Sequence, residues 1–299
     1  MKIFDCFIYS DEEMLLDIRL NTLSKFVDKF VIVEASYKHN GDQKKKNFNI
    51  EMFKKFQNKI DYIFIDKLPK GLNIVNSHDD ENTKSSKNIR NSIILEHYQR
   101  NMISDSLTSA SKDDLVLISD VDEIPILENL NFEKDKNNLI FFKQKMFYYK
   151  FNLLYENFDW IGTKACRKKS FISPQWLRDT KNKKYPFWRL DTFFNKNKYT
   201  NVSLIDNGGW HFTQIKSSAD IFLKLNTFAH HEDFKGSGLN QDDINNAVRE
   251  KKILYDHSAD KDMQDNKWIG NKTLKTINID TLPRYIFDNQ NKFKNWIDS

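Results

Sequence analysis

The chain has 299 residues, of which 30% are charged, with a mean hydropathy of −0.68 and a formal net charge of +5. No run approaches the roughly 18 apolar residues of a membrane-spanning helix, and the amino terminus lacks the apolar stretch of a signal peptide. With only two cysteines, these properties exclude an integral membrane protein and a disulfide-stapled secreted domain, and the length suits one large domain with a sizeable core.

The cysteines bear on the redox compartment of the protein, and the lysines bear on the partners that its surface can attract. Cys6 and Cys166 lie in apolar, strand-like segments, which predicts buried thiols in a reducing compartment, the cytoplasm. Lysine-rich clusters at 44–46, 167–169 and 181–184 are most simply solvated loops. Alternatively, they form a surface that attracts an anionic nucleotide, an anionic acceptor or, as a peripheral contact, a membrane face.

The first 125 residues alternate between strand-like and helix-like segments. Ser10 followed by Glu13 is a capping-box pattern, which predicts that a helix starts there. Further helices are predicted at 50–58 and 88–107, with a long polar loop at 69–87. The predicted strands are Lys2–Tyr9, Lys29–Ala35, Asp61–Asp66 and Leu115–Ser119. Such alternation predicts a mainly parallel sheet with helices on its faces.

Polar residues stand at the carboxyl ends of these four strands. Parallel sheets bind ligands beyond the carboxyl ends of their strands, so these side chains are predicted to line one crevice. Each one taken alone is equally well explained as an ordinary strand end. They are Tyr9, Glu34, Asp66 and Asp120.

The most informative stretch is DLVLISDVDEIP at 114–125. A short buried strand runs into Asp120, Asp122 and Glu123, whose negative charges repel one another, so a positive group is expected among them. If the strand continues, Asp120 and Asp122 point to the same side, roughly 7 Å apart, which suits a hard divalent cation that holds a phosphate-bearing substrate. Pro125 is then expected to stop the strand. A solvated Asp-rich turn is the competing interpretation.

After Pro125 the alternation fails. Aromatic runs at 139–154 and 160–172 predict added strands, with antiparallel pairing as one option, and 187–194 and 201–205 are shorter candidates. Four aromatic residues in a polar region match a sugar-binding cleft, although core packing explains each one singly. They are Trp176, Tyr185, Trp188 and Tyr199.

The second informative stretch is DNGGWHF at 206–212. Gly208 and Gly209 form the only Gly-Gly pair among eight glycines, which predicts a tight turn or a close backbone approach. His211, held on such a turn beside an aromatic residue, is a candidate metal ligand, because a cation bound by two carboxylates needs further ligands. A helix is predicted at 220–229.

These stretches, in this order, resemble glycosyltransferase family 17, which includes the β-1,4-mannosyl-glycoprotein N-acetylglucosaminyltransferase. The likeness rests on LLDIRLNTLSKFVDKFVIVEAS, on DLVLISDVDEIP, on GGWHF with FAHHE after it, and on LPRYIFDNQNKF. It implies an α/β fold that is GT-A-like, with a Rossmann-type, mainly parallel central sheet flanked by helices and added strands and helices in the C-terminal half. One domain would span 1–299, with 1–125 binding the nucleotide sugar and 126–299 binding the acceptor.

The resemblance also implies an inverting transfer of a sugar from a UDP-sugar to a glycan or glycoconjugate acceptor, with GlcNAc as the expected sugar. This transfer would depend on Mn²⁺ or Mg²⁺. By position, Asp120 and Asp122 match the D-x-D that holds the metal and the diphosphate, and His211 matches a third metal ligand. Glu34 and Arg100 match positions near the donor. Tyr9, at its strand end, belongs to the same predicted donor site.

The general base that takes the proton of the acceptor hydroxyl is less well defined. Glu232 is favoured because it follows the helix after G-W-H, and Asp206, Asp191 and Glu123 are alternatives. Two other classes stay open: a metal-dependent nucleotidyl- or phosphotransferase, and a non-catalytic carbohydrate-binding or nucleic-acid-binding protein. The mild net charge and the intact D-x-D favour an enzyme without a nucleic-acid partner.

Overall fold

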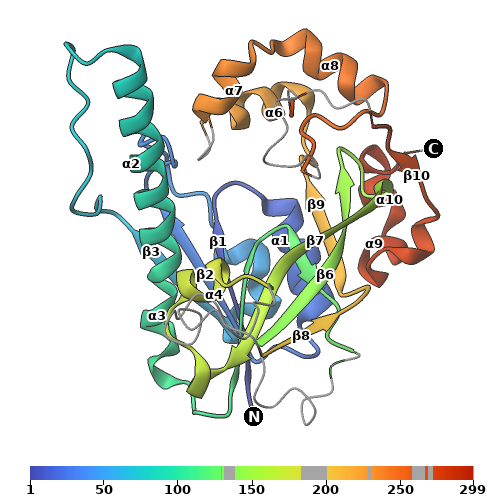
Figure 1. Cartoon of the computed structure of the whole chain (residues 1–299). Helices are drawn as coiled ribbons and strands as arrows, with labels where there is room; N and C mark the ends of the chain where they lie inside the picture. Colours follow the sequence, from blue (N-terminus) through green and yellow to red (C-terminus); the bar gives the residue numbers. More distant parts are fainter. Residues whose placement is uncertain are drawn as a thin grey trace, which may run out of the picture.

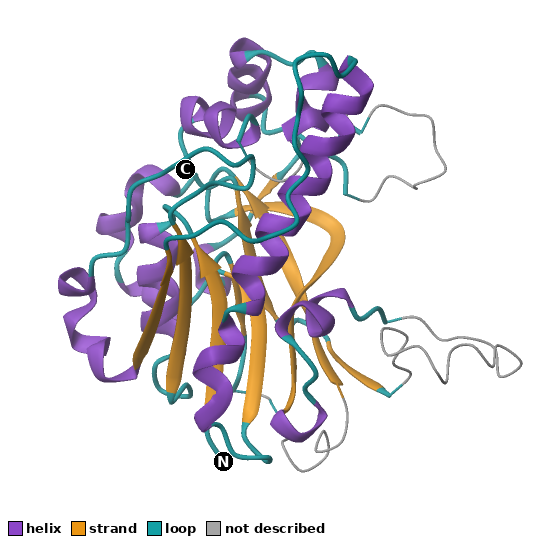
Figure 2. Cartoon of the chain, turned by 90° about the vertical axis from the view of Figure 1, so that its left-hand side faces the viewer, coloured by secondary structure: helices purple, strands orange, loops and turns teal. Residues whose placement is uncertain are grey.

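The structure is a computed structural model, and it describes residues 1–128, 130, 139–182, 201–227, 231–257, 267–268 and 272–298. One sheet forms its centre, and helices lie on both faces of that sheet (Figures 1 and 2). The predicted strand at 187–194 and Asp191 lie outside the described residues, as do Tyr185, Trp188 and Tyr199.

The amino-terminal half forms the parallel part of the sheet. In spatial order its strands are β3 (Ile60–Ile65), β2 (Lys29–Ala35), β1 (Ile3–Tyr9) and β4 (Leu115–Asp120). All three neighbouring pairs are parallel. Side chains alternate between the faces, so Phe7 packs into the core on one side and Cys6 into the core on the other, and both are fully buried.

The second half extends the sheet beyond β4. The added strands, in spatial order, are β7 (Leu153–Arg167), β6 (Leu139–Tyr148), β9 (Gly209–Thr213) and β5 (Glu123–Pro125), with β8 (Val202–Ile205) beside β6 and β10 (Lys275–Thr276) beside β7. β7 runs antiparallel to β4 and to β6, whereas β9 and β8 run parallel to β6. The sheet is therefore mixed on this side, and the added strands are confirmed.

Helices cover both faces of the sheet. The α-helices are α1 (Glu13–Leu23), α2 (Glu81–Asn101), α3 (Ile103–Ser106), α4 (Pro174–Asp179), α6 (Ser218–Leu225), α7 (His231–Ser237), α8 (Gln241–Arg249), α9 (Arg284–Asp288) and α10 (Gln290–Phe293). The 3₁₀ segments are η1 (Ile50–Lys59), η2 (Leu107–Ser109), η3 (Lys168–Ser170), η4 (Ile279–Thr281) and η5 (Lys294–Trp296).

Three apolar clusters hold these layers together. On one face α1, α9 and α10 pack against the strands. On the other face α2, α3 and α4 do so. The third cluster lies between the end of β6, the start of β7 and the helices α6 and α8. Figure 1 shows these helices together with α7 above one edge of the sheet. The predicted α/β class with a mainly parallel, helix-flanked sheet is confirmed, and the arrangement is compatible with a GT-A-like fold.

Two predicted helix starts are wrong. α1 begins at Glu13, and no capping box forms at Ser10, because the Glu12 carboxylate instead accepts the backbone N–H groups of Ser10 and Asp11 at 3.1 Å each. α2 begins at Glu81, within the predicted loop, where the Asp80 side chain accepts the Thr83 N–H at 2.9 Å. Its first turns face solvent and carry no apolar stripe, so periodicity could not reveal them.

Two predicted strand boundaries are also wrong. Pro125 does not stop the strand that precedes the acidic run: β4 ends at Asp120, and Pro125 is the last residue of a separate strand, β5, at the edge of the sheet. Proline is tolerated at such an edge because its missing N–H has no partner to lose. The aromatic run at 139–154 is broken by a turn after Tyr148, where Tyr149 has a φ of +62°.

Across the described ranges, no helix combines the length and the apolar character that crossing a bilayer requires.

Candidate active site

The acidic run forms the turn between β4 and β5, and Arg19 holds this turn from beneath. Arg19 comes from α1 and is fully buried. Its guanidinium donates to both carboxylate oxygens of Asp5, at 2.7 and 2.5 Å, and to the carbonyl oxygens of Asp120 and Glu123 at 3.1 and 2.6 Å. A buried guanidinium with several hydrogen bonds fixes the backbone segment that it contacts, so Arg19 holds the turn in one conformation.

Two further arginines grip the side chain of Asp120. Arg100 of α2 donates to Oδ1 at 3.0 Å, and Arg178 of α4 donates to Oδ2 at 2.8 Å. Burial alone would raise the pKa of Asp120, but the two guanidinium groups outweigh it and hold this pKa well below its usual range. The positive groups that the acidic run requires are therefore, in part, arginines of the chain itself.

Glu123 joins these groups into one network. It is 1% exposed, and its carboxylate accepts two hydrogen bonds from Arg178, at 2.7 and 2.9 Å, and one from the Asp120 N–H at 2.9 Å. The indole N–H of Trp160 donates to it at 2.6 Å. Glu123 therefore acts as a buried support that orients Arg178 and Trp160, which agrees poorly with a role as general base.

Sheet pairing brings Asp122 and His211 face to face. In β5 and β9, Glu123 stands opposite His211, and the Phe212 N–H donates to the Asp122 carbonyl at 2.9 Å. The Asp122 Oδ2 and His211 Nε2 atoms lie 3.7 Å apart. Burial alone would lower the pKa of His211, but the Asp122, Glu123 and Asp120 carboxylates outweigh it and raise that pKa above its usual value.

The glycine pair explains how β9 reaches this position. Gly209 has a φ of +140°, and a Cβ there would lie 2.1 Å from the Ile124 carbonyl oxygen. Only glycine allows this contact between β9 and β5. The predicted close backbone approach is confirmed, although His211 lies within a strand and not on the turn itself.

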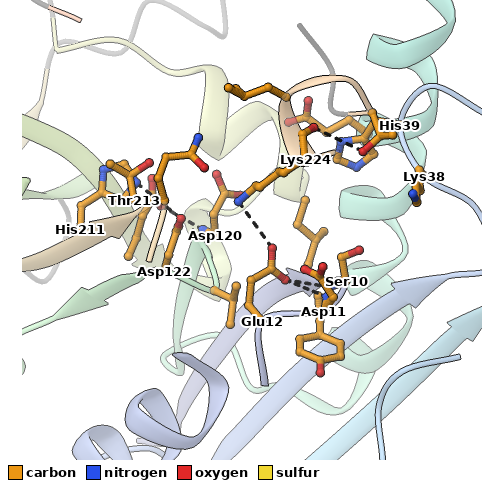
Figure 3. A pocket seen from close by; sticks show the side chains of 18 of the residues that line it. Ser10, Asp11, Glu12, Lys38, His39, Asp120, Asp122, His211, Thr213 and Lys224 are labelled. Atoms are coloured by element: carbon orange, nitrogen blue, oxygen red, sulfur yellow. Dashed lines mark hydrogen bonds and ion pairs between the residues drawn. The ribbon is translucent and has the colours of Figure 1, made fainter. Parts of the chain in front are cut away.

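A cavity of about 620 Å³ opens beyond the carboxyl ends of β1 and β4, where open parallel sheets bind ligands. Eight carboxylates line it, against five lysine and arginine side chains. Figure 3 shows Asp122 and His211 on one side of it and Lys224 of α6 reaching toward Glu12 from another. The Lys224 Nζ and Glu12 Oε1 atoms are 3.7 Å apart.

Lys224 is surrounded by negative charge. Burial alone would lower the pKa of its ammonium group, but the Glu12, Asp122, Asp11 and Asp120 carboxylates outweigh it and raise this pKa. Lys224 therefore stays positively charged at neutral pH, and its side chain, 31% exposed, opens to the cavity.

The structure brings most of the predicted donor-site and metal-site residues together. Tyr9, Arg100, Asp120, Asp122 and His211 all line the cavity. Glu34 is fully buried outside that lining, and its carboxylate accepts hydrogen bonds from Lys44, Tyr62 and the backbone of residues 47–48. Glu34 thus shapes the loop that carries Lys44, which does line the cavity. Asp66, the fourth polar strand end, is not part of the lining.

The two predicted general bases lie apart from the cavity. The side chain of Asp206 is 74% exposed and pairs with Lys143 at 2.7 Å. The Glu232 carboxylate lies 3.1 Å from His231 and also contacts Lys235 and Asn88, and Glu232 is not among the lining residues. Its neighbour Asp233 does line the cavity.

Sequence reasoning did not identify several contributors to the site, among them Glu12, Trp160, Arg178 and Lys224. The Ser173-Pro174 pair, in which the Ser173 side chain accepts the Trp176 N–H, is a helix-start signature that could have placed Arg178 on a short helix. No sequence signal puts that helix beside residues 120–123. Trp176, for which a sugar cleft and core packing were the two interpretations, is 7% exposed and packs from α4 into the core, so the second interpretation holds.

The metal that the family resemblance implies can be tested against these residues. Within the described part of the chain, no group of three or more histidine, cysteine, aspartate and glutamate side chains is gathered closely enough to hold an ion. The pair Asp122 and His211 does offer a carboxylate and an imidazole that face each other, and the buried Nδ1 of His211 has no hydrogen-bond partner. Mg²⁺ is usually held by one or two carboxylates completed by substrate phosphates, so Asp122 fits such an ion, and the His211 imidazole, once it has released its proton, would be a further ligand.

The family model described as glycosyltransferase family 17 matches residues 1–298, essentially the whole chain. No curated protein sequence matches it.

Proposed function

This chain belongs to glycosyltransferase family 17, and on that premise we propose that it is a metal-dependent, inverting enzyme that moves GlcNAc from UDP-GlcNAc to a hydroxyl group of a glycan. The observation that carries the proposal is the cavity at the carboxyl ends of β1 and β4, with Asp122 and His211 side by side within it. Such an edge is where nucleotides bind in open α/β sheets.

The charge of the cavity supports the requirement for a cation. A UDP-sugar carries a negatively charged diphosphate, and a lining with eight carboxylates and five basic side chains repels it. A divalent cation held by Asp122 and His211, with Asp120 beside them, would remove that repulsion. When bound, Mn²⁺ or Mg²⁺ stabilises the charge that grows on the leaving diphosphate.

The protein's own groups would perform the remaining work. In an inverting transfer the acceptor hydroxyl attacks the anomeric carbon from the face opposite the leaving UDP, and the cavity aligns the two. A carboxylate takes the hydroxyl proton, worth about 10² to 10⁴ in rate. For this carboxylate the sequence predicts Glu232 or Asp206; since neither lines the cavity, Asp233 is a further candidate.

Lys224 is proposed as a second positive contact for the diphosphate. It faces the same space as Asp120 and Asp122, and a donor phosphate would give its ammonium group a new partner. Lys224→Met is therefore expected to lower kcat by about 10²-fold, the usual cost of losing one such stabilising donor. The measurement is UDP release under saturating donor and acceptor.

The matched control is Lys216→Met. Lys216 pairs with Asp11 at 2.8 Å in the same segment but does not line the cavity. Its side chain is 17% exposed and does not face the cavity, so its loss should leave kcat within about twofold of wild type. Equal effects of the two substitutions would contradict a specific contact by Lys224.

A donor screen tests the function as a whole. The unfolding temperature is measured with UDP-GlcNAc, UDP-glucose, UDP-galactose and UDP, each with and without Mn²⁺. At 100 times Kd the true donor should stabilise the fold by about 2.7 kcal/mol, and the effect should need the cation. Product analysis should show free UDP. A sugar phosphate product would instead indicate a nucleotidyl- or phosphotransferase, and no response to any UDP-sugar would contradict the proposal.

A further inference from the structure

One end of the cavity is built from aromatic rings. Starting at His211, a row of ring contacts runs through Trp160, His257 and Tyr255 to Trp268, with centroid separations of 5.2, 5.4, 4.8 and 5.1 Å. All five residues line the cavity. The row begins beside Asp122 and reaches Trp268 through four ring contacts, so the five rings form a continuous part of the cavity wall, which we call the aromatic end; the part around Asp120, Asp122 and Lys224 is the charged end.

The first ring of the row has a fixed orientation. The N–H of Trp160 is bound by the buried Glu123 carboxylate at 2.6 Å, and Glu123 in turn is held by Arg178. A ring with its polar edge already satisfied offers only its apolar faces to a ligand. Trp160 therefore links the charged end to the aromatic end without adding charge.

Leu223 of α6 adds an apolar side chain that is left open. It lines the cavity and is 57% exposed, whereas its neighbour in sequence, Lys224, points to the charged end. Asp233 lines the same region, and together with burial, the larger cause, its carboxylate raises the pKa of the Tyr255 hydroxyl. The cavity wall thus combines the ring faces, a carboxylate near Tyr255 and an exposed aliphatic group of α6.

This combination matches one chemical class. A pyranose ring presents C–H groups on one face, which pack on aromatic rings, and hydroxyls at its rim, which bond to carboxylates. A diphosphate gains nothing from an apolar, acidic wall, whereas a uracil ring can stack on the same aromatic faces, so the UDP arm of the test below distinguishes the two ligands. We propose that the aromatic end, together with Leu223, binds a neutral pyranose of the acceptor, with Asp233 as partner of its hydroxyls. That this pyranose belongs to the acceptor rests on the proposed function, whereas the binding of a pyranose at this place does not.

The position of this site agrees with a transfer reaction. The row starts at His211, which faces Asp122. A sugar that stacks on Trp160 and Tyr255 would therefore lie next to the sugar of a donor whose diphosphate is bound at Asp122. The acceptor hydroxyl and the donor sugar would then meet between the two ends of one cavity.

Saturation-transfer NMR tests this directly, without any turnover. The probes are methyl β-D-glucopyranoside, methyl β-D-galactopyranoside and methyl α-D-mannopyranoside, with UDP as a separate ligand. At least one glycoside should receive saturation, most strongly at its ring C–H protons. Tyr255→Ala should weaken its binding about fivefold to tenfold, the value of one aromatic contact. UDP should bind the variant as it binds wild type.

A second variant keeps the test decisive if Tyr255→Ala folds poorly. Leu223→Ala removes an exposed side chain, which should not affect folding, and it should weaken the same glycoside measurably. Ile172→Ala, 52% exposed outside the cavity, and Phe287→Ala, outside it as well, are the matched controls and should change nothing. The inference is overturned if no glycoside binds or if the Leu223 and Tyr255 variants bind it as tightly as the controls do. Failure of UDP alone would overturn the proposed function instead.

Discussion

Asp122→Ala should lower kcat by about 10³-fold and leave the protein folded. The substitution removes one of the two side chains proposed to hold the cation, and losing the stabilisation of a developing charge costs several kcal/mol in the transition state. The side chain is 14% exposed, and its ion pair with His211 spans 3.7 Å, so the unfolding free energy should change by about 1 kcal/mol.

Two measurements separate a metal role from general damage. UDP release is measured against Mn²⁺ concentration, and the unfolding temperature is measured with UDP in the presence and absence of Mn²⁺. Asp122→Asn, which keeps the shape and removes the charge, should behave like Asp122→Ala. Asp159→Ala is the control, because Asp159 is 40% exposed and pairs with Lys145 on the surface. Unchanged turnover in Asp122→Ala would refute the assignment.

Arg19→Ala should have the largest effect on stability. Both Arg19 and Asp5 are fully buried, so the substitution leaves the Asp5 carboxylate without its partner and frees the carbonyls of the 120–123 turn. Breaking a buried pair in this way costs about 3–5 kcal/mol. Urea unfolding should report this loss, and activity should fall with it because the turn is no longer held by Arg19.

The surface pair of Arg284 and Asp288 provides the control. Its side chains are 79% and 49% exposed, and the two groups approach to 2.9 Å. Arg284→Ala should cost less than about 1 kcal/mol. In addition, Asp5→Leu combined with Arg19→Met should be more stable than Arg19→Ala, because no charge is left buried alone. If Arg19→Ala were no worse than Arg284→Ala, the buried pair would not support the turn.

The parallel half of the fold was predictable because local patterns determine it. β2 has the predicted bounds, since its apolar run is buried on both faces and flanked by charged residues. The start of α2 was not predictable from periodicity, because its first turns contact no core. The register that sets His211 opposite Glu123 depends on pairing between β5 and β9, which lie about 85 residues apart, and no local pattern encodes it.

The site residues show the same distinction between what local sequence patterns reveal and what only the folded sheet determines. Asp120, Asp122 and His211 sit in two short, unusual stretches and were found from them. Arg178 and Lys224 lie on two short helices, where a basic residue usually indicates only a solvated face. Their role depends on where α4 and α6 dock, and that is a property of the assembled sheet.

The turn at residues 120–123 takes its counter-charges from three separate helices, through Arg19, Arg100 and Arg178. A graft of this peptide onto another scaffold would thus transfer several carboxylates without the arginine side chains that neutralise their charge. Engineers who wish to transplant the donor chemistry must move α1, α2 and α4 along with it, since the smallest portable unit is a layered half-domain and not a loop.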